Sequence, residues 1–140
     1  PNYSHVTWQE IGQLAARGVM EIGNHTYNMH NYSPRFGASQ RRGETDEQYC
    51  LALSADIGNV QKRIFEQTGC ECKVFAYPFG KYSKLSEATL RGMGFRITLT
   101  CNEGVSTVTA NRPETLYLLK RVNRSGLYDT ATLLRKLGCE

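Results

Sequence analysis

Segments with helical periodicity alternate with short apolar runs along this chain, and this alternation constrains the fold more than any other feature. The clearest helix spans 45–67, where Thr45 and Gln48 form a capping box and apolar residues recur at steps of three and four. Gly69 is expected to end that helix. The other expected elements are helices at 7–17, 86–91 and from 129 onward, and strands at 19–22, 73–77, 95–100 and 116–122.

Strands that alternate with helices pair in parallel through right-handed crossovers, so the expected fold class is α/β. Four strands are too few to close a barrel of about eight. One long connection, residues 31–44, is polar and is interrupted by Pro34, Gly37 and Gly43. Because long loops inside compact domains are often functional, this segment is a candidate part of a site.

Composition narrows the functional classes. The chain has 140 residues, enough for one domain with a core, and no apolar run approaches the roughly 18 residues of a membrane span. The net charge is +4, from 17 basic and 13 acidic residues, but no Lys/Arg-rich run is interleaved with aromatics. Nucleic acid is therefore not an expected partner. Five cysteines, an odd number without zinc-knuckle spacing, do not indicate a disulfide framework.

Two of the three histidines, His25 and His30, follow the apolar run at 19–22. Residues five apart do not share a helix face, so two histidines that meet at this spacing must lie on a loop. Ligands and metals are often held at the ends of strands in α/β folds, and imidazole is the commonest metal ligand. From spacing alone, the alternative is a pair of polar loop histidines that never touch.

Several segments together resemble the polysaccharide deacetylase family, the NodB-homology carbohydrate esterases of family 4. Asn24-His25-Thr26-Tyr27-Asn28-Met29-His30 is similar to its metal-binding motif, with the spacing of the poly-N-acetylglucosamine deacetylase-like branch. Phe75-Ala76-Tyr77-Pro78-Phe79-Gly80-Lys81-Tyr82 resembles the motif that forms one wall of the sugar groove. Residues 94–100 and 118–122 resemble later strands of the same branch.

The resemblance implies an incomplete distorted (β/α) barrel, the NodB-homology fold, lacking its first strand or strands. The family's Thr-Phe-Asp-Asp-Gly motif is absent, and none of the three aspartates, Asp46, Asp56 and Asp129, has a similar setting. Residues 1–140 are therefore expected to form a single, N-terminally truncated domain. An open barrel edge predicts self-association.

The resemblance also implies a function: metal-dependent hydrolytic removal of acetyl groups from an N-acetylglucosamine polymer, in the cell envelope or outside the cell. His25 and His30 would bind the metal, zinc being usual in the family, and Thr26 would brace their loop. The Phe79 backbone N–H would stabilise the oxyanion, while Tyr77, Pro78 and Arg121 would bind the sugar. Core packing is the alternative for Tyr77 and Phe79, and for Arg121 the alternative is a surface or ion-paired strand residue. Without the aspartates, the chain alone is expected to be inactive, and a non-catalytic carbohydrate-binding relative is the alternative.

Overall fold

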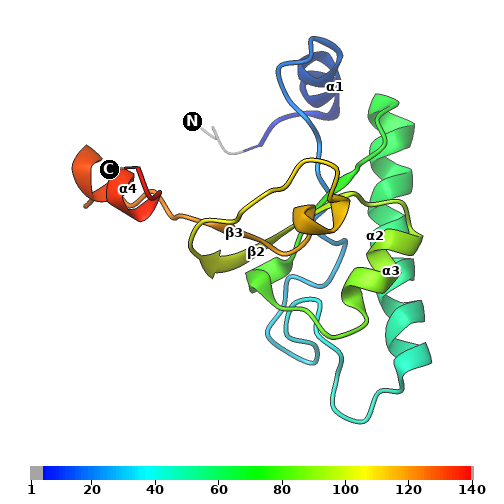
Figure 1. The fold of residues 1–140 in the computed structure, drawn as a ribbon. Helices are drawn as coiled ribbons and strands as arrows, with labels where there is room; N and C mark the ends of the chain where they lie inside the picture. The colour runs from blue at the N-terminus through cyan, green and yellow to red at the C-terminus, as the bar shows by residue number, and fades with distance from the viewer. Residues whose placement is uncertain (1–4, 140) are drawn as a thin grey trace.

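The computed structural model describes residues 5–139, in which helices and parallel strands alternate (Figure 1). The α-helices are α1 (Trp8–Ala16), α2 (Asp46–Thr68), α3 (Ser86–Gly92) and α4 (Thr130–Lys136). The strands are β1 (Val74–Ala76), β2 (Ile97–Glu103) and β3 (Leu119–Arg121), and two short 3-10 helices are η1 (Pro78–Gly80) and η2 (Pro113–Leu116). None of the helices in residues 5–139 is both long and apolar enough to cross a bilayer.

The three strands form a parallel sheet in the order β1-β2-β3, which confirms the α/β class. The strand expected at 19–22 is wrong. Val19 is 73% exposed and Met20 is 46% exposed, so these side chains are not buried against the sheet. The chain joins β1 only at Asn24, through a single parallel bridge to Phe75. The strand expected at 116–122 is shorter than predicted, because η2 occupies its start.

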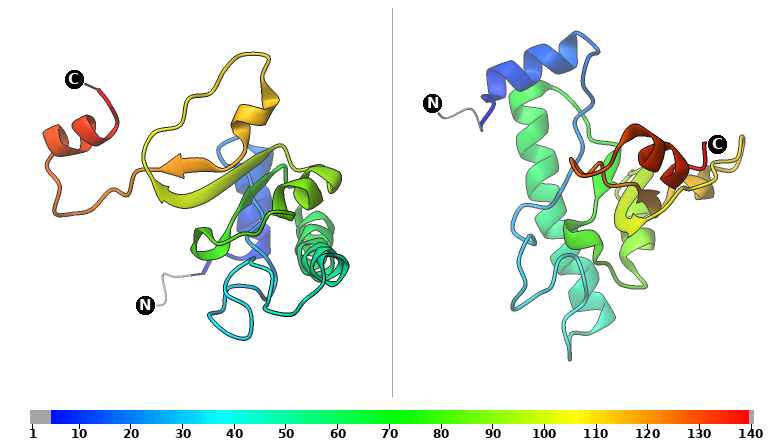
Figure 2. Two further views of the ribbon diagram at one scale, coloured as in Figure 1. Left: turned by 60° about the horizontal axis from the view of Figure 1, so that its bottom comes forward. Right: turned by 90° about the vertical axis from the view of Figure 1, so that its left-hand side faces the viewer.

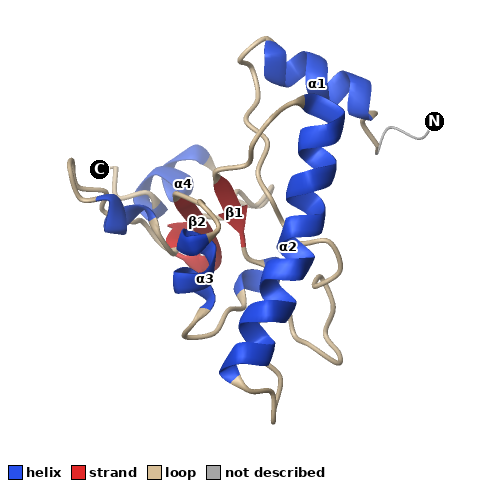
Figure 3. Ribbon diagram, turned by 90° about the vertical axis from the view of Figure 1, so that its right-hand side faces the viewer, coloured by secondary structure: helices blue, strands red, loops and turns tan. Residues whose placement is uncertain are grey.

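Helix α2 forms where the sequence predicted it. Its capping box at Thr45 and Gln48 is present, and Gly69 ends it in a left-handed conformation with φ of 71°. The buried stripe consists of Tyr49, Leu53, Ile57 and Ile64. Figure 3 shows α2 running past the edge strand β1, with α3 beside it. The stripe joins one core cluster with buried residues of the sheet and of the 31–44 loop.

The two terminal helices lie at the periphery. Helix α1 begins with the predicted capping box of Thr7 and Glu10 and crosses the C-terminal end of α2. Helix α4, capped by Asp129 as predicted, stands apart from α2 on the far side of the sheet (Figure 2). A 2.5 Å ion pair between Lys136 and Glu103 ties α4 to the end of β2. The sequence also predicts an irregular lead-in at 1–6, of which residues 1–4 lie outside the described residues.

Candidate functional site

The segment from Asn24 to His30 forms a turn that contacts both β1 and α2. Asn24 is 1% exposed, and its backbone bridges to β1. Its side-chain amide donates to the carbonyl of Ile57 on α2 at 3.1 Å, and its Oδ1 accepts the Thr26 N–H at 2.9 Å. A buried amide whose donor and acceptor are both used fixes the start of the turn relative to the helix and the sheet.

Asp56 on α2 holds the middle of the same turn. One carboxylate oxygen accepts the Tyr27 N–H at 2.7 Å, and the other accepts the Asn28 N–H at 2.8 Å. Thr26 reverses the chain with a φ of 71°, and its hydroxyl accepts the Met29 N–H at 3.3 Å. Thr26 thus braces the loop, as expected. Asp56 was missed, because an aspartate in the middle of a helix carries no local pattern that indicates this contact.

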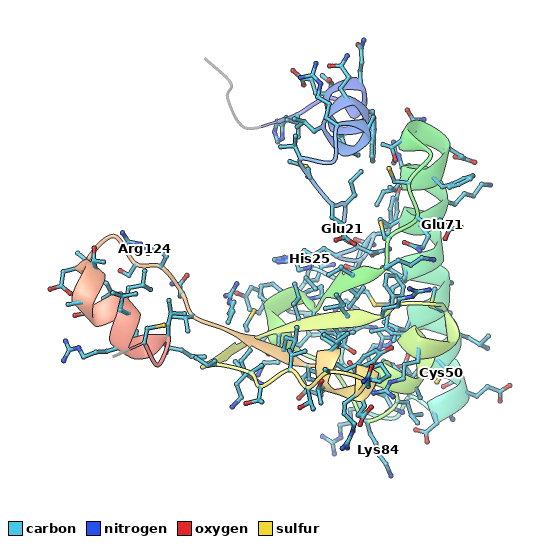
Figure 4. The ribbon with its side chains drawn as sticks, turned by 45° about the horizontal axis from the view of Figure 1, so that its top comes forward. Glu21, His25, Cys50, Glu71, Lys84 and Arg124 are labelled. Carbon is cyan, nitrogen blue, oxygen red and sulfur yellow. The ribbon has the colours of Figure 1, made fainter. Side chains whose placement is uncertain are left out.

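The turn brings the two imidazoles side by side. The ring centroids of His25 and His30 are 5.1 Å apart, with the planes tilted by 59°. His25 Nδ1 lies 2.7 Å from the carbonyl oxygen of Ala76 at the end of β1. A carbonyl only accepts, so in the neutral ring Nδ1 carries the proton and Nε2 keeps its lone pair. Figure 4 shows His25 beside the strands, on the side away from α2. The loop geometry therefore differs from a pair of histidines that never touch.

Both histidines border a cavity of about 350 Å³ at the carboxyl ends of the parallel strands. The predicted site residues that line it are His25, His30, Tyr77, Phe79 and Arg121. Cys101 of β2 completes the wall between β1 and β3. Two larger hollows, of about 630 and 420 Å³, lie along the 31–44 loop and contain no histidine. Among the cavities found within residues 5–139, the histidine cavity is the one whose lining contains imidazoles.

The η1 turn after β1 brings Phe79 to this cavity. Phe79 has a φ of 55° and Gly80 a φ of 66°, both left-handed. A Cβ at Gly80 would lie 2.5 Å from the backbone nitrogen of Cys101, so the close approach to β2 requires glycine. The turn is closed by the Gly80 N–H donating to Tyr77 and the Lys81 N–H donating to Pro78. Neither bond uses the Phe79 N–H.

Tyr77 and Pro78 are more deeply buried than expected for residues that form the wall of a sugar-binding groove. The Tyr77 side chain is 1% exposed and its hydroxyl donates to Glu87 Oε1 at 2.5 Å, while Thr98 donates to the same oxygen at 3.0 Å. Burial and the hydrogen bond to Glu87 raise the pKa of the Tyr77 phenol. The phenol is thus engaged inside the core, as in the core-packing alternative. Pro78 is also buried and does not line the cavity. Arg121 is exposed.

The donors available for a metal are the two imidazoles. Within residues 5–139 no three His, Cys, Asp or Glu side chains gather closely enough to hold an ion. Asp56 is used by the loop amides, Asp46 accepts from Gln40, and Asp129 caps α4. Two neutral imidazoles suit zinc, which takes at least three protein ligands at its catalytic sites. The described residues fit such an ion in ligand type and fall short in number.

Comparison with solved structures identifies proteins that share this fold. The deacetylase domain of BpsB from Bordetella bronchiseptica has a TM-score of 0.67 and 22% identity, covering 87% of this chain and 50% of that one. A de-N-acetylase from Aggregatibacter actinomycetemcomitans has a TM-score of 0.73 and 18% identity, covering 98% and 58%. IcaB from Ammonifex degensii has a TM-score of 0.63 and 21% identity, covering 86% and 49%. This chain therefore spans about half the length of these structures, which share its fold.

Sequence comparison assigns the family. No curated protein matches this chain. The model of the polysaccharide deacetylase family matches residues 2–98, which include both the histidine turn and the η1 turn. The match covers more than two thirds of the chain and confirms the resemblance on which the sequence analysis relied. The chain belongs to the polysaccharide deacetylase family.

Proposed function

We propose that this chain carries the histidine portion of the active site of a metal-dependent deacetylase that acts on an N-acetylglucosamine polymer. The observation that supports this most directly is the pair of imidazoles at the cavity, with the Nε2 lone pair of His25 left free. The similar solved structures include proteins named as a deacetylase domain and a de-N-acetylase. One hydrophobic cluster supports treating the chain as a single domain.

His25 and His30 would hold the metal, and zinc fits two neutral imidazoles. The bond from His25 Nδ1 to the Ala76 carbonyl is the outer contact that fixes the tautomer and the ring orientation of a ligating histidine. A zinc ion bound there would act as a Lewis acid and supply a nucleophile at neutral pH by lowering the pKa of water toward about 7.

The remaining cavity residues would bind the acetamide group and the sugar that carries it. The Phe79 N–H, unused by the turn's own hydrogen bonds, would donate to the oxyanion that develops on the acetamide carbonyl. One such donor typically contributes about 3 kcal/mol to the transition state. Arg121 at the end of β3 would donate to sugar hydroxyls. Because its ring is buried, Tyr77 would not contact the sugar; it would instead fix the end of β1 that leads into η1.

A catalytic base is required in addition, because a proton must leave the attacking water. The aspartates of the described residues are occupied elsewhere, so we expect no deacetylation by this 140-residue chain alone. The shortage of donors within residues 5–139 also favours the second candidate function, a carbohydrate-binding relative that kept the histidine cavity but not the base.

Zinc binding followed by acetate release tests the proposal. The purified chain should bind one Zn²⁺ in isothermal titration, and His25→Ala or His30→Ala should abolish that binding. His5→Ala is the matched control, because His5 is exposed near the chain start and distant in sequence. Retention of zinc by both cavity variants, or equal loss in the control, would refute the metal assignment. Acetate release from chitooligosaccharides by the isolated chain would refute its predicted inactivity.

A further inference from the structure

Three aromatic rings form a continuous surface beside the histidine cavity: Tyr32, Phe36 and Phe79, here called the aromatic shelf. The Tyr32 ring lies 5.3 Å from Phe36 at an interplanar angle of 29°, and 4.5 Å from Phe79 at 32°. Phe36 and Phe79 are 5.4 Å apart. Tyr32 is 74% exposed and Phe36 39%. Large aromatic side chains left exposed beside a cavity are typical of binding sites rather than of core packing.

The aromatic shelf is continuous with the candidate active site. Phe79 lines the histidine cavity, and its ring centroid lies 4.2 Å from that of His30. From His30 the aromatic surface therefore extends without a break through Phe79 to Tyr32 and Phe36. A ligand held at the cavity by one unit would present its next unit to this surface.

The loop that carries the aromatic shelf is fixed by buried polar contacts. The Arg35 guanidinium, between the two exposed aromatics in sequence, donates to both carboxylate oxygens of Glu44 at 2.9 and 2.5 Å and to the Ser39 carbonyl at 2.7 Å. Arg35 is 8% exposed. Gly37 follows with a φ of 57°, and a Cβ there would lie 2.5 Å from the Pro78 carbonyl oxygen. The entropy cost of ordering this loop therefore falls largely on folding, and little of it remains when a ligand binds.

A pyranose ring suits this surface better than other ligand types do. One face of an N-acetylglucosamine unit is made of C–H groups, which carry partial positive charge and pack on the negative face of an aromatic ring. Its hydroxyls project from the rim and stay in water, where the Tyr32 hydroxyl and the Lys81 ammonium, 5.3 Å from the Phe36 centroid, offer polar contacts. A purely apolar ligand would make no use of these polar groups.

We propose that the aromatic shelf is a sugar-stacking subsite for the unit next to the one in the histidine cavity, so that the site prefers an oligomer to a single sugar. This proposal rests on the proposed function for its ligand class. Chain-length preference then comes from Tyr32 and Phe36, whereas the histidines handle the unit that is deacetylated.

The test is a titration of the full 140-residue chain, followed by NMR, with N-acetylglucosamine and with its β-1,4- and β-1,6-linked trimers. Tyr32→Ala and Phe36→Ala should each weaken trimer binding about three- to tenfold. Binding of the single sugar should be unchanged, and Tyr32→Phe should restore trimer affinity. Phe65→Ala is the matched control, since Phe65 is 55% exposed on α2 and lies outside the histidine cavity.

The outcomes separate the two proposals. If the trimer binds normally to the Tyr32→Ala and Phe36→Ala double variant, or does not bind the wild type at all, the subsite is refuted. An equal loss in Phe65→Ala also refutes it. If the trimer binds in a Tyr32-dependent way to the His25→Ala and His30→Ala double variant, and wild type takes up no zinc, the subsite stands while the metal-dependent function fails. Amide spectra of each variant verify that it is folded.

Discussion

Replacing Asp56 should loosen the histidine loop without unfolding the domain. The carboxylate spans the Tyr27 and Asn28 N–H groups at 2.7 and 2.8 Å, from a half-buried position on α2. A hydrogen bond to a charged acceptor contributes about 1.5–3 kcal/mol when buried, and less where water competes. Both loop residues are exposed, so we expect about 1 kcal/mol for Asp56→Asn, which keeps one acceptor, and about 2 kcal/mol for Asp56→Ala.

Most of that loss should appear as local opening of the loop. Hydrogen exchange at the Tyr27 and Asn28 amides should accelerate about tenfold or more in Asp56→Ala, since about 1.4 kcal/mol corresponds to tenfold. Zinc affinity should fall about 10- to 100-fold, the usual effect of an outer contact to a metal site.

The matched control is Glu66→Ala, which removes one negative charge from an exposed position of the same helix, where Glu66 lies 3.8 Å from Lys62. Its effect on loop exchange and on zinc affinity should be negligible, as for most exposed ion pairs. If Asp56→Ala leaves both measurements at wild-type values, or if Glu66→Ala changes them equally, the loop is not positioned by Asp56.

Three further predictions concern the loop, the η1 turn and the sheet edge. Burial opposes ionisation of Glu44, but its hydrogen bonds with Arg35 and the Arg41 backbone outweigh this effect and lower the pKa of Glu44. The Arg35–Glu44 pair therefore stabilises the fold fully at pH values above the ordinary carboxyl pKa. This stabilisation is lost progressively as the pH falls through the lowered pKa of Glu44. Chemical denaturation should therefore give wild type a steeper loss of stability on acidification than Glu44→Gln, which should cost about 3 kcal/mol at neutral pH. Gly80→Ala should cost at least about 2 kcal/mol in thermal unfolding, since it combines a left-handed φ with a backbone clash. Because the outer edge of β1 is paired only at one bridge within residues 5–139, and Met20 is exposed in the segment that leads to that bridge, sedimentation should detect concentration-dependent association that Met20→Lys reduces.

The helices could be predicted because their signals are local. Thr45, Gln48 and Gly69 define the ends of α2 by contacts within one turn of the chain, and the apolar stripe between them needs only the helical period. The run at 19–22 has three apolar residues out of four, yet Val19 lies in solvent. Whether such a run becomes a strand depends on a partner strand elsewhere, and nothing in four consecutive residues carries that information.

The residue types of the candidate site could be predicted from the sequence, but the contacts that hold those residues in place could not. The spacing of the histidines indicated a loop, and the family motif indicated a metal. The contacts that hold the loop join residues far apart in the chain: Asn24 to Ile57, Tyr27 to Asp56, and His25 to Ala76 across 51 positions. The stacking of Tyr32 on Phe79 is of the same kind. Contacts at such separations follow from the packing of α2 and the sheet.

The physical nature of these contacts also determines how the site can fail. Five positions separate His25 from His30, and the rings meet because Thr26 turns the chain at a positive φ and the carboxylate of Asp56 on α2 accepts two N–H groups of the loop backbone. These are polar contacts at a partly exposed surface, whereas the domain is held by the apolar cluster around α2. Loss of a polar contact moves the imidazoles apart by loop opening, at a cost well below the free energy of global unfolding. Variants of the loop should therefore lose metal affinity while remaining folded, and variants of the α2 stripe should lose both together.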